Sequence, residues 1–345
     1  MYMIVGSGIV GCYLGKLLGE QEIWEKNKAI MEKPCSSLLS KTGLESLDID
    51  YKGCVLNEIS GARFISGKQE FAVEKSKPQA FVLDRLALQK ELISEAEESG
   101  CRIRYGRTWN GQQDNTIIGA DGALSAVAKS MGIKRDYIHA YQIKAELSRR
   151  MDDDIVELYF GRVAPGFFAW RIPFDARHAE IGIGVSGNPK PFFDKFAKRF
   201  EIKKIDKVQS ALIPVFDAAQ RTAIGNKILV GDAAGQVKAS TGGGIIFGCK
   251  CAKALADSIS AGNIGGYEKE WRKKYERDLK THLWMRRFLN RTDYDELFST
   301  IKKQKMDSLI EKYGDMDHPA VLAKQILKQP KLWFSALRLF SRKSI

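Results

Sequence analysis

The glycine pattern near the N-terminus constrains the fold of this chain more than any other feature. Residues 1–5 are apolar and predict a short strand, and the motif GSGIVG at 6–11 leads directly into an apolar helix over 12–18. Glycines at this spacing allow a tight turn, a close approach of backbone to a pyrophosphate, and close packing of helix on strand. A second predicted strand, 22–25, ends in Glu25, where an acid can accept hydrogen bonds from ribose hydroxyls. The chain therefore opens as a βαβ unit that binds a dinucleotide.

Two later segments also place glycines directly after a predicted strand. The motif GADGALS occupies 119–125, although an Asp-Gly pair alone is usually a turn. The motif GDAAG at 231–235 follows a buried strand over 227–230, and TGGGI follows at 241–245. Asp232 is placed to accept from a ribityl hydroxyl, and the glycine run presents backbone N–H groups to a pyrophosphate. Each segment alone is compatible with an ordinary strand-to-helix turn, but all three in this order favour one nucleotide-binding domain.

The middle of the chain is dominated by short strands. A helix is predicted over 84–99, and alternating apolar and polar residues then favour an antiparallel sheet with one face covered. A helix over 190–207 and a strand over 209–215 follow, and everything after Gly266 is predicted helical. The expected short strands span 54–59, 62–65, 70–73, 138–147, 155–160, 167–172 and 179–185.

Positive charge is in excess, with 55 Lys plus Arg against 42 Asp plus Glu and a formal net charge of +13. One basic cluster lies at 195–207, and no acidic residue follows Asp317. Such a surplus is compatible with nucleic acid, an anionic membrane surface, or anionic ligands. Because no known nucleic-acid-binding module is present, we expect no nucleic-acid partner. The basic residues after Asp317 are Lys324, Lys328, Lys331, Arg338, Arg342 and Lys343.

Cysteine and histidine spacing excludes several classes of protein. The six cysteines contain no CxxC pair and the four histidines lie far apart, so no zinc or iron–sulfur site is expected. A disulfide framework is not expected in so long a chain. The apolar N-terminus lacks the basic residues of a signal peptide, and no run of 18 uncharged apolar residues exists. We therefore expect a cytoplasmic protein.

The order of these motifs resembles that of FAD-dependent proteins with the para-hydroxybenzoate hydroxylase fold. Within that group the chain is most similar to the geranylgeranyl reductase family, which includes archaeal digeranylgeranylglycerophospholipid reductases. Over about residues 1–262, the segments that carry the resemblance are KPCS at 33–36, Asp84-Arg85 at a helix start, the GDAAG and TGGGI motifs, and PGFFAWRIP at 165–173.

The match to the family pattern is incomplete at several positions. Ser36 stands where the family usually has Gly, and Ala239 where it often has Pro. Phe168 and Ile172 replace the Tyr and Phe of a YxWxFP motif, which removes a phenol from the expected substrate wall. Ala128 occupies the place where flavin hydroxylases often carry Arg, which disfavours a hydroxylase.

The resemblance implies a Rossmann-like α/β FAD-binding domain, an inserted antiparallel-sheet substrate domain of α+β type, and a C-terminal helical region. The FAD-binding domain would comprise 1–51, 75–136 and 217–262. The substrate domain would comprise 52–74 and 137–216, and the helical region 263–345.

The resemblance and the motifs together assign the site residues. The expected FAD-binding residues are Gly6, Gly8, Ile9, Val10, Gly11, Glu25, Lys26, Cys35, Ser36, Arg85, Asp121, Gly122, Gly231, Asp232, Gly242, Gly243, Gly244 and Ile245. Cys35 is also the one catalytic candidate, although a cysteine is more often a small buried hydrophobe. The expected substrate residues are Phe167, Phe168, Trp170 and Pro173; the rings are equally compatible with a sheet core. No metal is expected.

The implied activity is reduction of isoprenoid (geranylgeranyl) C=C bonds of membrane ether-lipid precursors. The electron donor would be reduced ferredoxin or NAD(P)H. Three alternatives stay open: an FAD-dependent aromatic hydroxylase, a non-catalytic flavin- or lipid-binding protein, and a reductase of tetrapyrrole tails.

The C-terminal tail mixes basic residues with large apolar ones. This pattern favours a helix lying on an anionic membrane, and it is equally compatible with a helix that covers the FAD-binding domain. The apolar residues are Leu327, Leu332, Trp333, Phe334, Leu337, Leu339 and Phe340.

Overall fold

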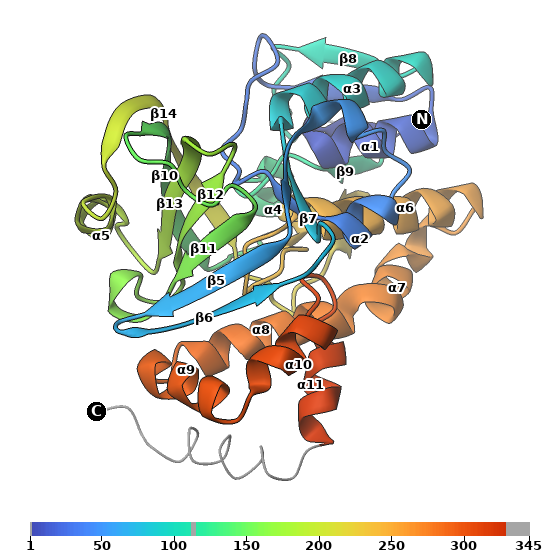
Figure 1. Ribbon diagram of the computed structural model, residues 1–345. Coiled ribbons are helices and arrows are strands. Elements are labelled where there is room, and N and C mark those ends of the chain that lie inside the picture. Colours follow the sequence, from blue (N-terminus) through green and yellow to red (C-terminus); the bar gives the residue numbers. More distant parts are fainter. Residues whose placement is uncertain (1, 112–114, 329–345) are drawn as a thin grey trace.

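The computed structural model describes residues 2–111 and 115–328. Figure 1 shows three neighbouring parts: a helix-covered sheet that carries the N-terminus, a large twisted sheet beside it, and C-terminal helices that run beneath both. The expected fold class, an α/β domain with an inserted sheet and a helical C-terminal region, is confirmed.

The first part is built on a six-stranded sheet. Neighbouring strands in it are parallel, as consecutive βαβ units require, except that the edge strand β15 runs antiparallel to its neighbour β16. In spatial order they are β15 (Ala223–Ile224), β16 (Lys227–Leu229), β9 (Ile117–Gly119), β1 (Met3–Val5), β2 (Glu22–Glu25) and β8 (Arg102–Tyr105).

Helices α1 (Ile9–Leu18), α3 (Arg85–Glu98) and α6 (Ile245–Ser260) pack against this sheet and share its apolar core. The sequence begins α3 at Arg85 because the Asp84 side chain accepts from the backbone N–H groups of the next turn. A short helix, α4 (Ala126–Ser130), follows β9.

The second part is a seven-stranded sheet. All its neighbouring pairs are antiparallel except β5 with β11. One face packs on α5 (Lys190–Ala197) through Phe193 and Phe196. Its spatial order is β14 (Ile202–Pro214), β10 (Tyr137–Leu147), β13 (His178–Val185), β12 (Ala169–Pro173), β11 (Ile155–Tyr159), β5 (Gly61–Ser66) and β6 (Gln69–Glu74).

A small antiparallel sheet of β3 (Leu38–Ser40), β7 (Ala80–Leu83) and β4 (Val55–Ile59) lies against the other face of the large sheet. The short helix α2 (Lys41–Glu45) follows β3. The segment 52–74 therefore contributes to two sheets, because β4 pairs with β7 whereas β5 and β6 join the large sheet.

The predicted helix over 190–207 is wrong in its second half. Helix α5 ends at Ala197, and β14 begins at Ile202 and pairs with β10 along its whole length. The lysines of this segment have a good intrinsic helix propensity. In the edge strand β14, however, their charged ends stay in water and disfavour pairing of the open edge with another chain. Tertiary pairing therefore overrides the local preference. The strand predicted from 167 also begins later, at Ala169.

The helical C-terminal region is confirmed up to Lys328. Figure 1 shows its helices beneath β5 and β6, where α9 packs through Phe298 and Ile301. No helix within the described ranges is long and apolar enough to cross a membrane. The tail positions 329–345, including Lys331, Trp333, Phe334 and the later basic and apolar residues, lie outside the described residues. The helices of this region are α7 (Tyr267–Trp271), a π-helical continuation (Arg272–Glu276), α8 (Arg277–Leu289), α9 (Tyr294–Lys303), α10 (Met306–Tyr313) and α11 (Ala320–Leu327).

Short 3-10 helices occur elsewhere along the described chain. They are η1 (Lys52–Cys54), η2 (Gly161–Val163), η3 (Gly231–Ala234) and η4 (Ile264–Gly266).

Candidate cofactor and substrate site

The turn between β1 and α1 has the close backbone approaches that its glycines predict. Gly6 has a φ of +106°, and a Cβ there would lie 2.6 Å from the carbonyl oxygen of Ala120. A Cβ on Gly11 would overlap the carbonyl oxygen of Gly6. Both positions therefore exclude any larger side chain, since backbone atoms cannot give way as side chains do.

The N-terminus of α1 faces a lysine. Gly8 precedes the helix, and no side chain caps the first turn. The Nζ atom of Lys33 lies 3.3 Å from where a Gly8 Cβ would stand. Burial lowers the pKa of Lys33, and the nearby carboxylates of Glu25 and Asp232 oppose that shift. An anion at this turn would meet both free helix N–H groups and a cation.

Glu25, at the end of β2, is buried and accepts hydrogen bonds from the glycine turn. Its Oε2 accepts from the backbone N–H (3.1 Å) and hydroxyl (3.0 Å) of Ser7, and its Oε1 accepts twice from Asn27. Burial alone raises the pKa of Glu25, but these hydrogen bonds and the charge of Lys33 hold it below its usual value. The expected ribose contact would use the remaining lone pairs of this carboxylate.

Arg85 reaches the same turn through a glutamine. Its Nη1 donates to Gln89 Oε1 (3.0 Å), and Gln89 Nε2 donates to the carbonyl of Ser7 (2.8 Å). The sequence resemblance placed Arg85 beside the cofactor, and the structure brings it to the glycine turn. The role of Gln89 in linking Arg85 to the glycine turn was not predicted, because nothing in the sequence distinguishes this glutamine from other polar residues of the helix.

Asp121 stabilises the start of α4. Its carboxylate accepts from the Ser125 hydroxyl (2.5 Å) and from the backbone N–H of Ala126 (2.7 Å), so it caps α4. Gly122 has a φ of +81° and open space at its Cβ position. Their predicted contact with a cofactor stays a prediction.

Asp232 of the GDAAG motif lies against Gly244 of the TGGGI motif. A Cβ on Gly244 would overlap Oδ1 of Asp232, and Gly244 precedes α6 without a side-chain cap. Burial raises the pKa of Asp232, against the charges of Arg85, Lys33 and Arg135. A Cβ on Gly231 would press on Val10 of α1. The two glycine-led helix starts thus lie beside one carboxylate and several cations.

A buried ion pair ties the glycine run to the C-terminal region. Lys238 Nζ lies 2.6 Å from Asp317 Oδ1, and the Lys238 backbone N–H donates to the carbonyl of Gly243. The hydroxyl of Ser40 also donates to Asp317. Sequence reasoning missed this pair, because its members are far apart in the chain.

Cys35 lies in the segment between β2 and β3, next to the large sheet. Its carbonyl accepts from Gln142 Nε2 of β10 (3.2 Å), and its Sγ accepts from the Ser37 N–H (3.3 Å). Burial raises the pKa of Cys35, with the charge of Arg85 opposing, so the sulfur is a neutral thiol at neutral pH. Of its predicted neighbours, Ser36 is half-buried and Lys26 is exposed.

The predicted substrate residues split into two groups. Phe167 and Phe168 stack at 4.1 Å between ring centroids, and Phe168 meets Trp170 edge-on at 5.8 Å. Phe167 lies 3.4 Å from the Cβ position of Gly242, so this aromatic wall contacts the glycine run. Pro173 alternates to the opposite face of β12 from Trp170 and does not join the wall.

These residues fit a flavin dinucleotide. Two uncapped helix starts and two cations, Lys33 and Arg85, suit a pyrophosphate. Two carboxylates, Glu25 and Asp232, suit hydroxyl groups on either side of it. Ile9 and Ile245 occupy the first positions of α1 and α6, and their predicted contact with the cofactor stays a prediction. Bound there, the flavin would supply hydride transfer.

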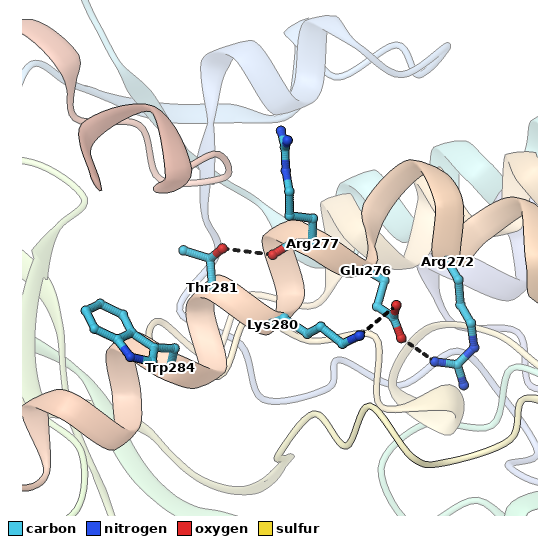
Figure 2. A pocket seen from close by; sticks show the side chains of 6 residues that line it. All are labelled: Arg272, Glu276, Arg277, Lys280, Thr281 and Trp284. Carbon is cyan, nitrogen blue, oxygen red and sulfur yellow. Dashed lines mark hydrogen bonds and ion pairs between the residues drawn. The ribbon is translucent and has the colours of Figure 1, made fainter. Parts of the chain in front are cut away.

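A separate hollow of about 470 Å³ lies on the C-terminal region (Figure 2). Glu276 joins Arg272 (2.5 Å) and Lys280 (2.9 Å) there, and Trp284 at its end is 54% exposed. Its lining residues are Arg272, Glu276, Arg277, Lys280, Thr281 and Trp284, and none belongs to the glycine turns or the aromatic wall.

Comparison with known proteins agrees with this geometry. The family model of the geranylgeranyl reductase catalytic domain matches residues 136–216, the segment that carries the aromatic wall. The digeranylgeranylglycerophospholipid reductase of Methanothrix thermoacetophila is 28% identical, over 86% of this chain and 88% of that protein. A second such reductase, from Methanothermobacter thermautotrophicus, is 26% identical over 88% and 86%. Residues 136–216 thus match the geranylgeranyl reductase catalytic domain, and the chain is similar over most of its length to these two reductases. It is a flavin-dependent oxidoreductase that acts on C=C bonds.

Solved structures support the fold of this reductase. A geranylgeranyl bacteriochlorophyll reductase-like protein from Thermoplasma acidophilum superposes with a TM-score of 0.82, covering 98% of each chain at 22% identity. The p-nitrophenol 4-monooxygenase PnpA of Pseudomonas putida superposes with a TM-score of 0.68 at 15% identity, covering 96% of this chain and 97% of its own. The fold is thus shared with proteins of different chemistry, and the reaction must be argued from the site.

Proposed function

We propose that this reductase binds FAD and saturates the isoprenoid C=C bonds of membrane ether-lipid precursors. The observation that carries the proposal is the contact between Phe167 and Gly242, which joins an aromatic wall to the glycine run expected at the flavin. An apolar polyene chain would lie along such a wall and be held beside the reacting ring. The names of the archaeal relatives support a phosphate-headed isoprenoid lipid as substrate.

FAD, rather than a mononucleotide flavin, is supported by the two glycine-led helix starts and by Glu25 at the end of β2. A mononucleotide would leave the Glu25 end without a ligand. Denaturing the purified protein and separating the released flavin by chromatography tests this point. FAD is the expected product, and a protein that carries no flavin or only the mononucleotide contradicts it.

Lipid analysis tests the substrate. Mass spectrometry of lipids from a geranylgeranyl-lipid-producing host that expresses this chain should show masses raised by two hydrogens per reduced bond. A Gly11→Ala chain, whose turn cannot close, is the matched control and should leave the lipids unchanged. Unsaturated lipids in both hosts, together with hydroxylation of an aromatic compound by the wild type, would favour the aromatic hydroxylase instead.

The proposal includes two partners. Electrons would come from reduced ferredoxin or NAD(P)H, which can be compared by following flavin reduction without oxygen. Peripheral contact with an anionic membrane is supported by exposed Trp284 and Leu327 near basic residues of the C-terminal region. Removing residues 320–345 should then reduce pelleting with anionic vesicles, and unchanged pelleting contradicts the membrane contact.

A further inference from the structure

Glu180 is a completely buried acid in the middle of the large sheet. It lies on β13, and among the described residues 2–111 and 115–328 its side chain has no cation as a hydrogen-bonding partner. Oε1 accepts from the indole Nε1 of Trp170 (3.1 Å), and Oε2 accepts from Nε2 of Gln142 (2.9 Å). Both donors are neutral, so nothing in direct contact compensates a negative charge here.

The charged groups near Glu180 are already engaged with one another. Lys144 of β10 pairs with Glu32 at 2.8 Å, and Lys207 of β14 pairs with Glu32 as well. Burial raises the pKa of Glu180 to about 8, against the Trp170 hydrogen bond and the charge of Lys144, and the charge of Glu32 adds to the rise. Glu180 is therefore a carboxylic acid at neutral pH.

Glu180 shares a face with the aromatic wall. Cross-strand pairing places Trp170, Gly182 and Gln142 in one row, with Glu180 two residues before Gly182 on the same face. Gln142 Nε2 also lies 3.2 Å from the carbonyl of Cys35. The acid therefore stands between the wall and the Cys35 segment.

The space beside Glu180 is filled by a ring rather than by backbone. The indole of Trp170 covers Gly182 so closely that a Cβ there would overlap it, and the ring of Phe167 covers Gly184 in the same way. At two glycines of β13, the rings of Trp170 and Phe167 thus occupy the space that side chains would fill. An apolar chain that displaced the indole would come into contact with the carboxyl group.

We propose that Glu180 donates the proton in the reduction of the alkene. This inference rests on the proposed function. The C=C π bond breaks, one carbon gains a hydride with two electrons from the reduced flavin, and the other carbon gains the proton of the Glu180 O–H bond. Glu180 is left as a carboxylate beside Trp170 and regains a proton from water before the next turnover.

Glu157 provides a matched control on the other face of the same sheet. This buried acid accepts from Arg171 Nε at 2.9 Å and Nη2 at 2.5 Å, and from Arg63 at 3.3 Å. Glu157→Gln removes a buried carboxyl of the same size without touching the aromatic wall. Glu180→Gln removes the proton and keeps the shape, and Glu180→Asp keeps an acid.

The first experiment measures the proton directly. Infrared difference spectra of the flavin-loaded wild type across the pH range should show a protonated carboxyl band that disappears with a midpoint near pH 8. Glu180→Gln should lack this band, and Glu157→Gln should keep it. A band that is absent from the wild type overturns the inference.

The second experiment measures the reaction. Chemically reduced, flavin-loaded variants are mixed without oxygen with a geranylgeranyl lipid, and flavin reoxidation is followed against pH. Glu180→Gln should be slower by about 100-fold or more, the range for loss of a general acid, and Glu180→Asp should recover part of the rate. Glu157→Gln should react at the wild-type rate per bound flavin.

The outcomes separate the two claims. A Glu180→Gln rate and pH profile equal to wild type overturn the proton donation alone. A wild type that leaves every isoprenoid bond intact overturns the proposed function, and the proton donation with it. If Glu180→Gln does not fold, Glu180→Asp decides, because a shorter acid must change the rate and its pH profile when the carboxyl contacts the alkene.

Discussion

Two buried glutamates, Glu157 and Glu180, lie on opposite faces of one seven-stranded sheet and meet opposite surroundings. On the face that α5 covers, Glu157 is held by Arg171 and Arg63. On the face toward the aromatic wall, the donors to Glu180 within the described part of the chain are the neutral Trp170 and Gln142. A buried carboxyl is tolerated either as an ion with cations or as an acid that keeps its proton. The contacts of Glu157 with its arginines link neighbouring strands of the sheet, whereas Glu180 holds a proton beside the expected site.

The largest effect on stability should come from removing the cation on the structural face. Arg171→Leu leaves Glu157 buried with the Tyr159 hydroxyl and the partly exposed Arg63 as its partners, and should lower the free energy of unfolding by about 3 kcal/mol, the lower end for a broken buried ion pair. Urea denaturation measures this loss. Arg63→Leu, at a more exposed arginine, should cost about 1 kcal/mol. Equal losses would show that the pairing with Arg171 is not the stronger one.

The second effect is the pH dependence that Glu180 supplies. Below about pH 4 the folded and unfolded chains both carry this proton, and its contribution to stability is complete. Between there and about pH 8 the unfolded chain loses the proton while the folded chain keeps it. The free energy of unfolding of wild type relative to Glu180→Gln should therefore fall by up to about 1.4 kcal/mol per pH unit.

Denaturation at several pH values measures that difference. Glu157→Gln, which retains Glu180, should follow the slope of the wild type. If the unfolding free energies of wild type and Glu180→Gln run parallel between about pH 5 and about pH 8, Glu180 is already ionised in the folded chain over that range.

A third effect, smaller than that of Arg171→Leu, should come from the neutral donor. Gln142→Leu removes the contacts of its amide nitrogen with Glu180, with Gln209 Oε1 and with the Cys35 carbonyl, and should cost about 1–2 kcal/mol of unfolding free energy. The pKa of Glu180 should rise further, because a donor that stabilises the ion is lost. The infrared midpoint checks this direction. A midpoint that falls would mean that Gln142 stabilises the neutral acid.

The glycine turns could be predicted from sequence because their constraints are local. Gly6 and Gly11 must admit backbone atoms within a few residues, and that requirement is visible as a spacing. The relatives agree with the family resemblance that the motif order indicated. Lys33 was quoted in a motif but given no role, since only the fold brings its Nζ atom to Gly8.

The contrast between the two glutamates could not be predicted. Each lies in a strand between apolar neighbours, so their local patterns look alike. Their partners come from other strands: Arg171 is 14 residues from Glu157, and Gln142 is 38 residues from Glu180. The wrong helix over 202–207 has the same cause, because pairing with β10 decides a segment whose lysines favour helix.

Anaerobic single turnover tests the account most directly. The purified protein is loaded with FAD, reduced chemically, and mixed with a geranylgeranyl lipid while flavin absorbance and lipid mass are recorded. The account predicts that oxidised flavin returns as the lipid gains two hydrogens per turnover, and that Glu180→Gln slows both together. Flavin that stays reduced beside an unchanged lipid would contradict the central claim that this site saturates isoprenoid C=C bonds.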